Sequence, residues 1–193
     1  MLPLLVAVAI FGAQPCSAAA TAGLADASAR VQAFDVPGAV DRLRDPAAGG
    51  CEATEVAALY LRGLFAATEA YKQGGSEASL APVREAIAAL ETLSGQRPGA
   101  AEIARLVLVA AVAAAQSERE EMGAFLTHAA AMESLQLAAG EPGAPVLSAL
   151  EVAGELWLQV HRFDDARAAF ERAVAQVGAT PRLTAGLARA TAR

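Results

Sequence analysis

The sequence predicts an all-α domain built from antiparallel helical hairpins, on three observations. Apolar residues recur every three or four positions along most of the chain, which is the spacing of one face of a helix. Runs of β-branched residues and sustained apolar-polar alternation, which mark strands, do not occur. Alanine, the best helix former, supplies 52 of the 193 residues, and few Gly or Pro residues interrupt the expected helices.

The clearest hairpin lies between Leu147 and Thr180. Two apolar stripes flank a break at His161-Arg162: the first is Leu147, Leu150, Gly154, Trp157 and Val160, and the second is Ala166, Phe170, Ala173 and Val177. Gly154 and Ala166 are small, so the two helix backbones are expected to approach each other closely.

The ends of this hairpin are predicted as well. Phe163 follows the turn and is expected to plug the end of the pair, while Asp164 or Asp165 is expected to cap the second helix. Gly178 is expected to end that helix, and Thr180-Pro181 to begin a further one.

This order of small and aromatic residues resembles the tetratricopeptide repeat (TPR), a two-helix unit of about 34 residues. The residues that carry the resemblance are Gly154, Trp157, Ala166, Phe170 and Ala173. Leu150 stands where the family usually has Trp, and the closing proline comes late, at Pro181. The resemblance implies a short right-handed solenoid of stacked hairpins, about three of which are needed for stability.

Two more helix pairs are expected upstream, near residues 52–94 and 100–138. In the first pair Gly74-Gly75 separates the helices, and Pro82 falls in the first turn of the second helix. In the second pair Ser117 and Glu120 have the spacing of a capping box that would begin a new helix. Residues 106–115 are apolar on every side, which is typical of a helix buried in the middle of a stack.

The predicted domain covers residues 24–193. One or two short helices are expected in residues 24–43, interrupted from Asp35 to Gly38. The last hairpin is the pair at residues 147–178, and a terminal helix at residues 181–193 is expected to cover it, because Leu183 and Leu187 lie one turn apart and arginines occupy the other faces.

Residues 1–25 contain no charged side chain, and residues 2–13 form an apolar core of signal-peptide length. The small residues at positions 18–20 predict cleavage near Thr21, so residues 1–20 are interpreted as a signal peptide and the protein as periplasmic or secreted. The alternative is an uncleaved membrane anchor.

Cys16 follows the apolar core at the place where bacterial lipoproteins carry their lipid. Residues 13–15 argue against a lipid, because they lack the Leu and the small residue that usually precede such a cysteine. If the leader is removed, Cys51 is the only thiol left, and it is expected to be free, to form an intermolecular bridge, or to have no function.

The sequence contains no pattern that predicts a catalytic, metal or cofactor site. The two histidines, His128 and His161, belong to no metal-ligand motif, and the cysteines are not paired in sequence. The sole lysine, Lys72, closes a helix and follows no phosphate-binding loop. The attraction of a helix N-terminus for acidic residues explains one dense group of carboxylates, Glu118, Glu120 and Glu121.

Nucleic acid is not an expected partner. The formal charge is −6, aromatic residues make up 5% of the chain, and no run of Lys or Arg occurs. The chain therefore lacks both an electrostatic track for phosphates and a stacking platform for bases. A membrane is expected as a partner only through the retained leader or a lipid on Cys16.

What remains is recognition of a protein or peptide. The resemblance implies that the first helix of the hairpin lines a concave groove with Ser148, Glu151, Glu155, Leu158 and Gln159 exposed. Glu151 and Glu155 would make this groove acidic, where chaperone-binding members of the family carry Lys and Asn. A basic or neutral peptide is therefore expected in preference to an acidic one. The alternative is that the glutamates only keep the helix soluble.

Two functional hypotheses follow. The first is an exported TPR-like scaffold that binds a protein or peptide and has no catalytic activity. The second is a small helical enzyme or ligand carrier with a pocket between its helices. A closed polar pocket with converging titratable groups would favour this second hypothesis, and a solid alanine-leucine core would not.

Overall fold

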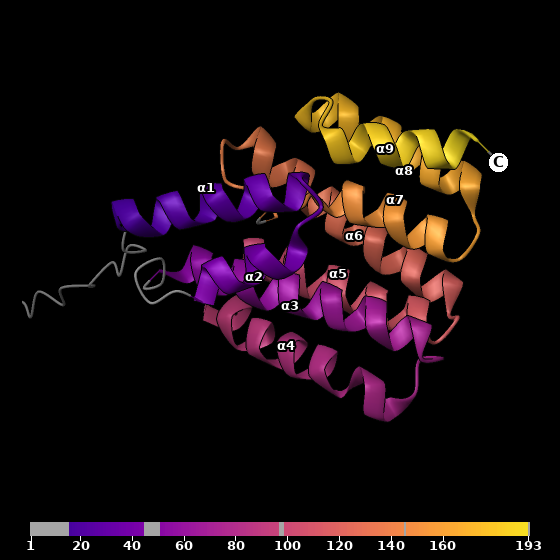
Figure 1. The fold of residues 1–193 in the computed structure, drawn as a ribbon, viewed down its shortest axis with the longest axis horizontal. Coiled ribbons are helices and arrows are strands. Elements are labelled where there is room, and N and C mark those ends of the chain that lie inside the picture. The colour runs from indigo at the N-terminus through magenta and orange to yellow at the C-terminus, as the bar shows by residue number, and fades with distance from the viewer. Residues whose placement is uncertain (1–15, 45–50, 97–98, 145, 193) are drawn as a thin grey trace, which may run out of the picture.

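The computed structural model describes residues 16–44, 51–96, 99–144 and 146–192, and these residues form nine helices and no strand (Figure 1). All-α architecture is therefore confirmed. In chain order the helices are α1 Ala18–Gln32, α2 Val36–Arg44, α3 Glu52–Lys72, α4 Glu77–Gln96, α5 Ala100–Ala115, α6 Arg119–Ala138, α7 Ala149–Gln159, α8 Phe163–Val177 and α9 Pro181–Thr191.

Each helix packs chiefly against a neighbour in the chain, in the pairs α1/α2, α3/α4, α5/α6 and α7/α8, with α9 against α8. The first helices of three pairs, α3, α5 and α7, also pack side by side. As a result the helices form a stack that runs from α4 at one end to α8 and α9 at the other, while α1 and α2 lie beside α3 (Figure 1).

Helix α5 lies in the middle of this stack, in contact with α3, α4, α6 and α7. Between Leu106 and Ala115 every residue except Val109 is buried, which confirms the prediction drawn from its all-round apolar sequence. The approach of α3 to α5 is close at Gly63, where an added methyl group would lie 2.4 Å from a Leu108 methyl carbon.

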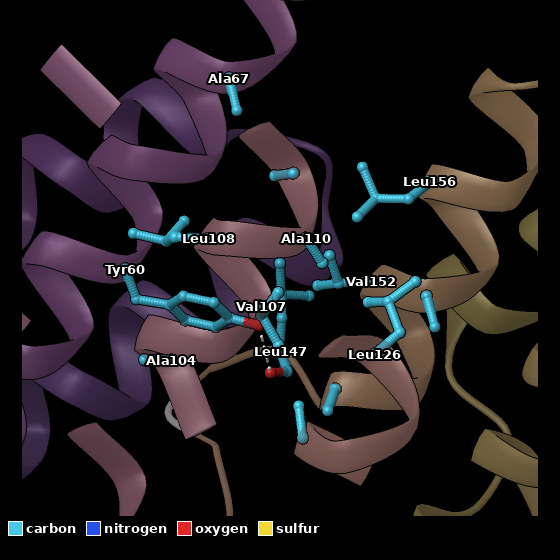
Figure 2. Packing of buried hydrophobic residues seen from close by; sticks show 14 of the residues in the cluster. Tyr60, Ala67, Ala104, Val107, Leu108, Ala110, Leu126, Leu147, Val152 and Leu156 are labelled. Atoms are coloured by element: carbon cyan, nitrogen blue, oxygen red, sulfur yellow. Dashed lines mark hydrogen bonds between the residues drawn. The ribbon is translucent and has the colours of Figure 1, made fainter. Parts of the chain in front are cut away.

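The core beside α5 is made mostly of Ala, Val and Leu and holds one buried aromatic ring with a polar end. Tyr60 of α3 is fully buried among Ala104, Val107 and Leu108 (Figure 2). Its hydroxyl donates a hydrogen bond to the backbone oxygen of Leu147, 3.3 Å away, in the segment just before α7. This bond joins α3 to the start of the last hairpin across 87 residues of sequence.

The α7–α8 hairpin has the packing that its sequence predicts. A methyl group added at Gly154 of α7 would lie 2.5 Å from the ring of Phe170 in α8, and one added at Gly186 of α9 would lie equally close to the same ring. Phe170 is fully buried between these two glycines. Thr180 caps α9 by accepting a hydrogen bond from the Leu183 N–H at 3.2 Å, and Pro181 is its first residue, as predicted.

Four local predictions differ from the structure. Two short helices do form at the start of the domain, but the break between them covers residues 33–35 and not Asp35 to Gly38: Asp35 accepts a hydrogen bond from the Gly38 N–H at 3.0 Å and so caps α2, whose first turn contains Pro37. Ser117 does not open a capping box, because its φ is 67° and Glu118 is the N-cap of α6.

The other two predictions that differ from the structure concern the starts of α8 and α4. The residue at the N-cap of α8 is Arg162, and the predicted caps Asp164 and Asp165 lie in the first helical turn, where they still favour the helix dipole. Helix α4 begins at Glu77, earlier than predicted, so Pro82 lies inside the helix and not in its first turn.

Candidate functional site

Four helices and one turn together line a groove of about 590 Å³. Its walls are α3, α7 and α9, Ala111 of α5 lies on its floor, and the turn between α1 and α2 borders it. The groove therefore lies on the side of the stack where the first helices of the pairs lie next to one another.

The groove is mainly apolar. Leu61, Leu64 and Phe65 of α3 face Val152 and Leu156 of α7 across it. Two of its aromatic residues are unusually exposed for their size, with 49% of Phe65 and 55% of Phe34 accessible to solvent. Exposed aromatic side chains beside an apolar cleft are typical of surfaces that bind a partner.

Helix α9 brings two arginines to the groove, and each forms an ion pair with α7. Arg182 Nε donates to Glu151 Oε1 at 2.8 Å, and Arg189 Nη2 donates to Glu155 Oε1 at 2.5 Å. The first pair is buried, because the side chain of Arg182 is 13% exposed and that of Glu151 is 4% exposed. The second pair is open to water.

Arg182 of α9 also contacts the turn between α1 and α2. Its guanidinium lies 5.1 Å from the centre of the Phe34 ring, in the turn between α1 and α2. Phe34 has a φ of 63°, a left-handed conformation that is unfavourable for a phenylalanine. The strained turn thus holds an aromatic ring at the edge of the groove, where it meets the cation.

Three of the five residues predicted to line the groove do line it, and two do not. Glu155, Leu158 and Gln159 do line it. Ser148 is the N-cap of α7 and accepts a hydrogen bond from the Glu151 N–H at 3.1 Å. The prediction that Glu151 is exposed is wrong, because its carboxylate is turned toward Arg182 and the residue is buried.

The expected acidic character of the groove is also wrong. Each glutamate of α7 faces an arginine, and Glu69 faces Lys72 at 2.7 Å on α3. Sequence reasoning placed the arginines of α9 on its water-facing side. Arg182 and Arg189 are seven residues apart and so share one face of α9. This spacing was the sequence signal that could have paired them with Glu151 and Glu155.

The repeat-packing residues mostly lie in the interior of the last hairpin. Leu150, Gly154, Ala166, Phe170 and Ala173 are buried. Trp157 is half-buried, and its ring would lie 3.2 Å from a methyl group added at Gly123 of α6. The Arg162 guanidinium lies 5.7 Å from the centre of the Trp157 ring. Phe163 is half-buried at the first position of α8, and its ring lies 6.0 Å from that of His161.

A second polar feature lies under the start of α7. Glu133 of α6 is buried, and its two oxygens accept hydrogen bonds from the N–H groups of Ala144 at 2.9 Å and Ala149 at 2.8 Å. Burial raises the pKa of Glu133, and these two hydrogen bonds offset the shift only in part. Burial likewise raises the pKa of Glu151, against the opposing effect of Arg182.

The two cysteines form a disulfide between Cys16, just before α1, and Cys51, just before α3. Cys51 was expected to be the only thiol if the leader is removed; with Cys16 present, it has a partner within the chain. A sulfur in a disulfide cannot also carry a lipid, so the bridged protein has no acylated Cys16. Thr21, the predicted cleavage point, lies in the first turn of α1, and the adjacent Ala20 is buried.

The other residues that the sequence offers for catalysis or metal binding do not come together in one site. His128 and His161 are both exposed, and the glutamates at the start of α6 are exposed as well. In the described ranges no three His, Cys, Asp or Glu side chains come together as a metal site would need. None of the helices described is both long enough and apolar enough to cross a membrane.

Comparisons of the chain with protein-family models, with curated proteins and with solved structures find no match. The function must therefore be inferred from the groove and its residues.

Proposed function

We propose that this protein is an exported, non-catalytic scaffold that binds a partner protein through the groove between α3, α7 and α9. The observation that carries this proposal is an apolar cleft whose lining includes two exposed aromatic rings, Phe34 and Phe65. Burial of large aromatic side chains supplies much of the binding energy in protein interfaces. The charged groups around the cleft are paired with one another, as expected of a rim that orients a partner.

The TPR-like part of the proposal rests on the last hairpin. Small residues at positions 154 and 166 sit beside the large ring of Phe170, and α3, α5 and α7 lie next to one another as first helices of successive repeats do in a solenoid. In such a solenoid the first helices line the concave surface, and two of the first helices here, α3 and α7, line the groove.

Export is supported by two independent features. The apolar segment at residues 2–13 has the length of a signal peptide, and disulfides persist in oxidising compartments such as the periplasm or the exterior of the cell. A periplasmic or secreted protein with the Cys16–Cys51 bridge satisfies both. Because the bridge needs Cys16, we place any removal of the leader before that residue and not near Thr21.

A ligand carrier is the second candidate. The groove volume of about 590 Å³ falls within the range of small-molecule sites, roughly 300 to 1,000 Å³. Its apolar floor would suit an apolar small molecule. The opening of the groove to solvent and its exposed aromatic rings favour a protein partner instead.

Photo-crosslinking tests the proposal. Phe34 is replaced by p-benzoylphenylalanine, which keeps an aromatic side chain at the edge of the groove, and the full-length protein is irradiated in cells that produce it. We expect one discrete crosslinked product, and we expect Phe65→Arg to abolish it, because a cation would then occupy the apolar cleft. The partner is identified by mass spectrometry, and its purified form is titrated against both proteins.

The matched controls use Leu135 of α6, which is 73% exposed and does not line the groove. The photo-reactive residue at position 135 should not give the same product, and Leu135→Arg should leave crosslinking from position 34 unchanged. Equal crosslinking from both positions, or a product that survives Phe65→Arg, would rule out the groove as the binding site.

A further inference from the structure

Resting on the proposed function, we propose that the redox state of the Cys16–Cys51 bridge regulates binding in the groove. In the oxidised protein the α1–α2 pair completes the groove, and the partner binds. Reduction of the bridge releases this pair from the stack and weakens binding. Three observations lead to this assignment: the share of the groove that the pair supplies, the way in which the pair is attached, and the access of a thiol to the bridge.

The α1–α2 pair supplies one border of the groove. Phe34, Val36 and Pro37 belong to this pair, and all three line the groove. The Phe34 ring is 5.1 Å from the guanidinium of Arg182, so the pair meets α9 there. Because aromatic side chains supply much of the energy of protein binding, displacement of Phe34 removes one of the two exposed rings on which the proposed binding depends.

Two covalent links attach the pair to α3. The chain itself joins the end of α2 to the start of α3, and the bridge joins the start of α1 to the same place, because Cys16 precedes α1 and Cys51 precedes α3. Both ends of the pair are therefore tied beside the first turn of α3. When the bridge is reduced, the α2 end stays tied and the α1 end depends on packing alone.

Packing holds α1 weakly. Helix α1 packs chiefly against α2 and contacts α3 at few positions. Its buried residues are Ala20, Gly23, Ala27 and Val31, of which only Val31 is larger than alanine. Ala20, close to the bridge, is buried but lies outside the contiguous hydrophobic core. Since small side chains bury little apolar area, these contacts stabilise the position of α1 only slightly.

The rest of the stack is held by contacts that involve neither α1 nor α2. Helix α5 contacts α3, α4, α6 and α7, and α8 packs against α7 and α9. The other walls of the groove, on α3, α7 and α9, therefore keep their places when the pair is released. Reduction is expected to open one side of the groove and to leave the stack folded.

A thiol can reach the bridge. Both cysteines are partly exposed, and Cys51 lines an open hollow of about 610 Å³ between α2, α3 and α4. One thiolate of a dithiol reductant attacks the sulfur of Cys16, and Cys51 leaves as a thiolate, which the dipole of α3 favours at its N-cap. The second thiol of the reductant then displaces Cys16. The reductant ends as a disulfide, and both cysteines take up a proton and become thiols.

Hydrogen exchange of the full-length protein tests the attachment. When a dithiol reductant is added, we expect the amides of α1 to exchange at least about tenfold faster and those of α5 to keep their rates. Reoxidation should restore the slow rates, which distinguishes release of the pair from misfolding. The Cys16→Ser/Cys51→Ser variant should show the fast rates in α1 with and without the reductant. Unchanged rates in α1 of the reduced parent would overturn the proposal.

Photo-crosslinking in cells tests the effect on binding. Phe65 of α3, which stays in the stack, is replaced by p-benzoylphenylalanine in the parent and in the Cys16→Ser/Cys51→Ser variant. At equal amounts of exported protein, we expect the yield of crosslinked product to fall at least about fivefold in the variant. Equal yields together with fast exchange in α1 would overturn regulation by the bridge and leave the proposed function in place. Absence of a product from both position 34 and position 65 in the oxidised parent would overturn both.

Discussion

At the residue scale, the last hairpin depends on two glycines that hold the ring of Phe170 from both sides. A side chain at Gly154 has no room, because Gly186 blocks the movement of the ring away from α7. Packing of this kind is specific: it depends on which residue lacks a side chain and not only on how apolar the helix is.

We expect Gly154→Ala to lower the free energy of unfolding by about 1 to 3 kcal/mol, because the new methyl group overlaps the Phe170 ring. The measurement is urea unfolding followed by circular dichroism. Gly95→Ala in α4 is the matched control, because no atom lies within 4 Å of the added methyl group. There the better helix propensity of Ala should raise stability by up to about 1 kcal/mol. Equal effects at both sites would contradict the packing.

The two arginines of α9 provide a second matched comparison. Arg182→Ala leaves Glu151 buried without a cation, and we expect a loss of about 3 kcal/mol in the free energy of unfolding. Arg189→Ala removes the partner of Glu155 in a pair that is open to water, and we expect a loss below about 1 kcal/mol. Denaturant unfolding of both variants tests this order. If Arg189→Ala cost as much as Arg182→Ala, burial would not be the deciding factor.

At the element scale, the position of α7 depends on groups that lie outside it. Glu133 of α6 accepts a hydrogen bond from the N–H of Ala149, which lies in the first turn of α7. The Tyr60 hydroxyl of α3 donates a hydrogen bond to Leu147, the residue before Ser148, which is the N-cap of α7. Burial, followed by the charges of Glu133 and Glu151, raises the pKa of Tyr60 well above its ordinary value. The start of α7 is therefore held by polar groups that are out of contact with water.

This arrangement makes stability depend on pH. A carboxyl group whose pKa is raised by folding stabilises the fold fully below its unfolded pKa, near 4.5, and that contribution is lost as the pH rises through the folded pKa. Since Glu133 and Glu151 both have raised pKa values, we expect the midpoint of thermal unfolding to be higher at about pH 5 than at about pH 8.

Glu133→Gln should weaken this dependence, because it removes one of the two titrating groups. The same change at Glu141, an exposed residue in the connection between α6 and α7, is the control and should leave the profile as it is. Calorimetry across the pH range gives the midpoints. A profile as steep in Glu133→Gln as in the parent would show that this carboxyl group does not cause it.

At the scale of the whole molecule, the Cys16–Cys51 bridge attaches the first helix pair to the stack. The buried face of α1 consists of Ala20, Gly23, Ala27 and Val31, which are small and bury little apolar area. The bridge closes a loop across a sequence separation of 35 residues. A crosslink of that span stabilises by roughly 4 kcal/mol, chiefly by restricting the unfolded chain.

We therefore expect Cys51→Ser to lower the free energy of unfolding by about 2 to 4 kcal/mol. A thiol reductant should lower the unfolding midpoint of the parent and leave that of a variant with both cysteines replaced by serine unchanged. Mass spectrometry after alkylation should find no free thiol in the protein isolated without a reductant. Full alkylation of both cysteines without prior reduction would contradict the bridge.

Much of the fold could be predicted from local sequence, and most of the groove could not. The all-α class, the buried α5 and the packing of Gly154 against Phe170 follow from periodicity and residue size, which act within one or two helices. The Cys16–Cys51 bridge and the ion pair between Glu151 and Arg182 join residues that lie 35 and 31 positions apart. Such pairs depend on how the helices stack, which periodicity does not encode.

The same limit explains the error at Glu151. Its position on α7 predicts exposure if the helix is considered alone, but α9 covers that face and brings a cation to it. The position of Phe34 could not be predicted for a similar reason, because nothing in its local sequence shows that Arg182 lies beside it. Capping was mispredicted at Ser117 because a capping-box spacing is common and the actual backbone there is left-handed.

The position of Phe170 has a consequence for binding. The ring touches α7 at Gly154 and α9 at Gly186, and these two helices lie side by side in the groove wall, yet Phe170 itself does not line the groove. The spacing of α7 and α9 is thus set by a residue outside the groove. Changing this one spacer and its two glycines would shift α9 relative to α7 and so reshape the groove, while every side chain that lines it stays the same.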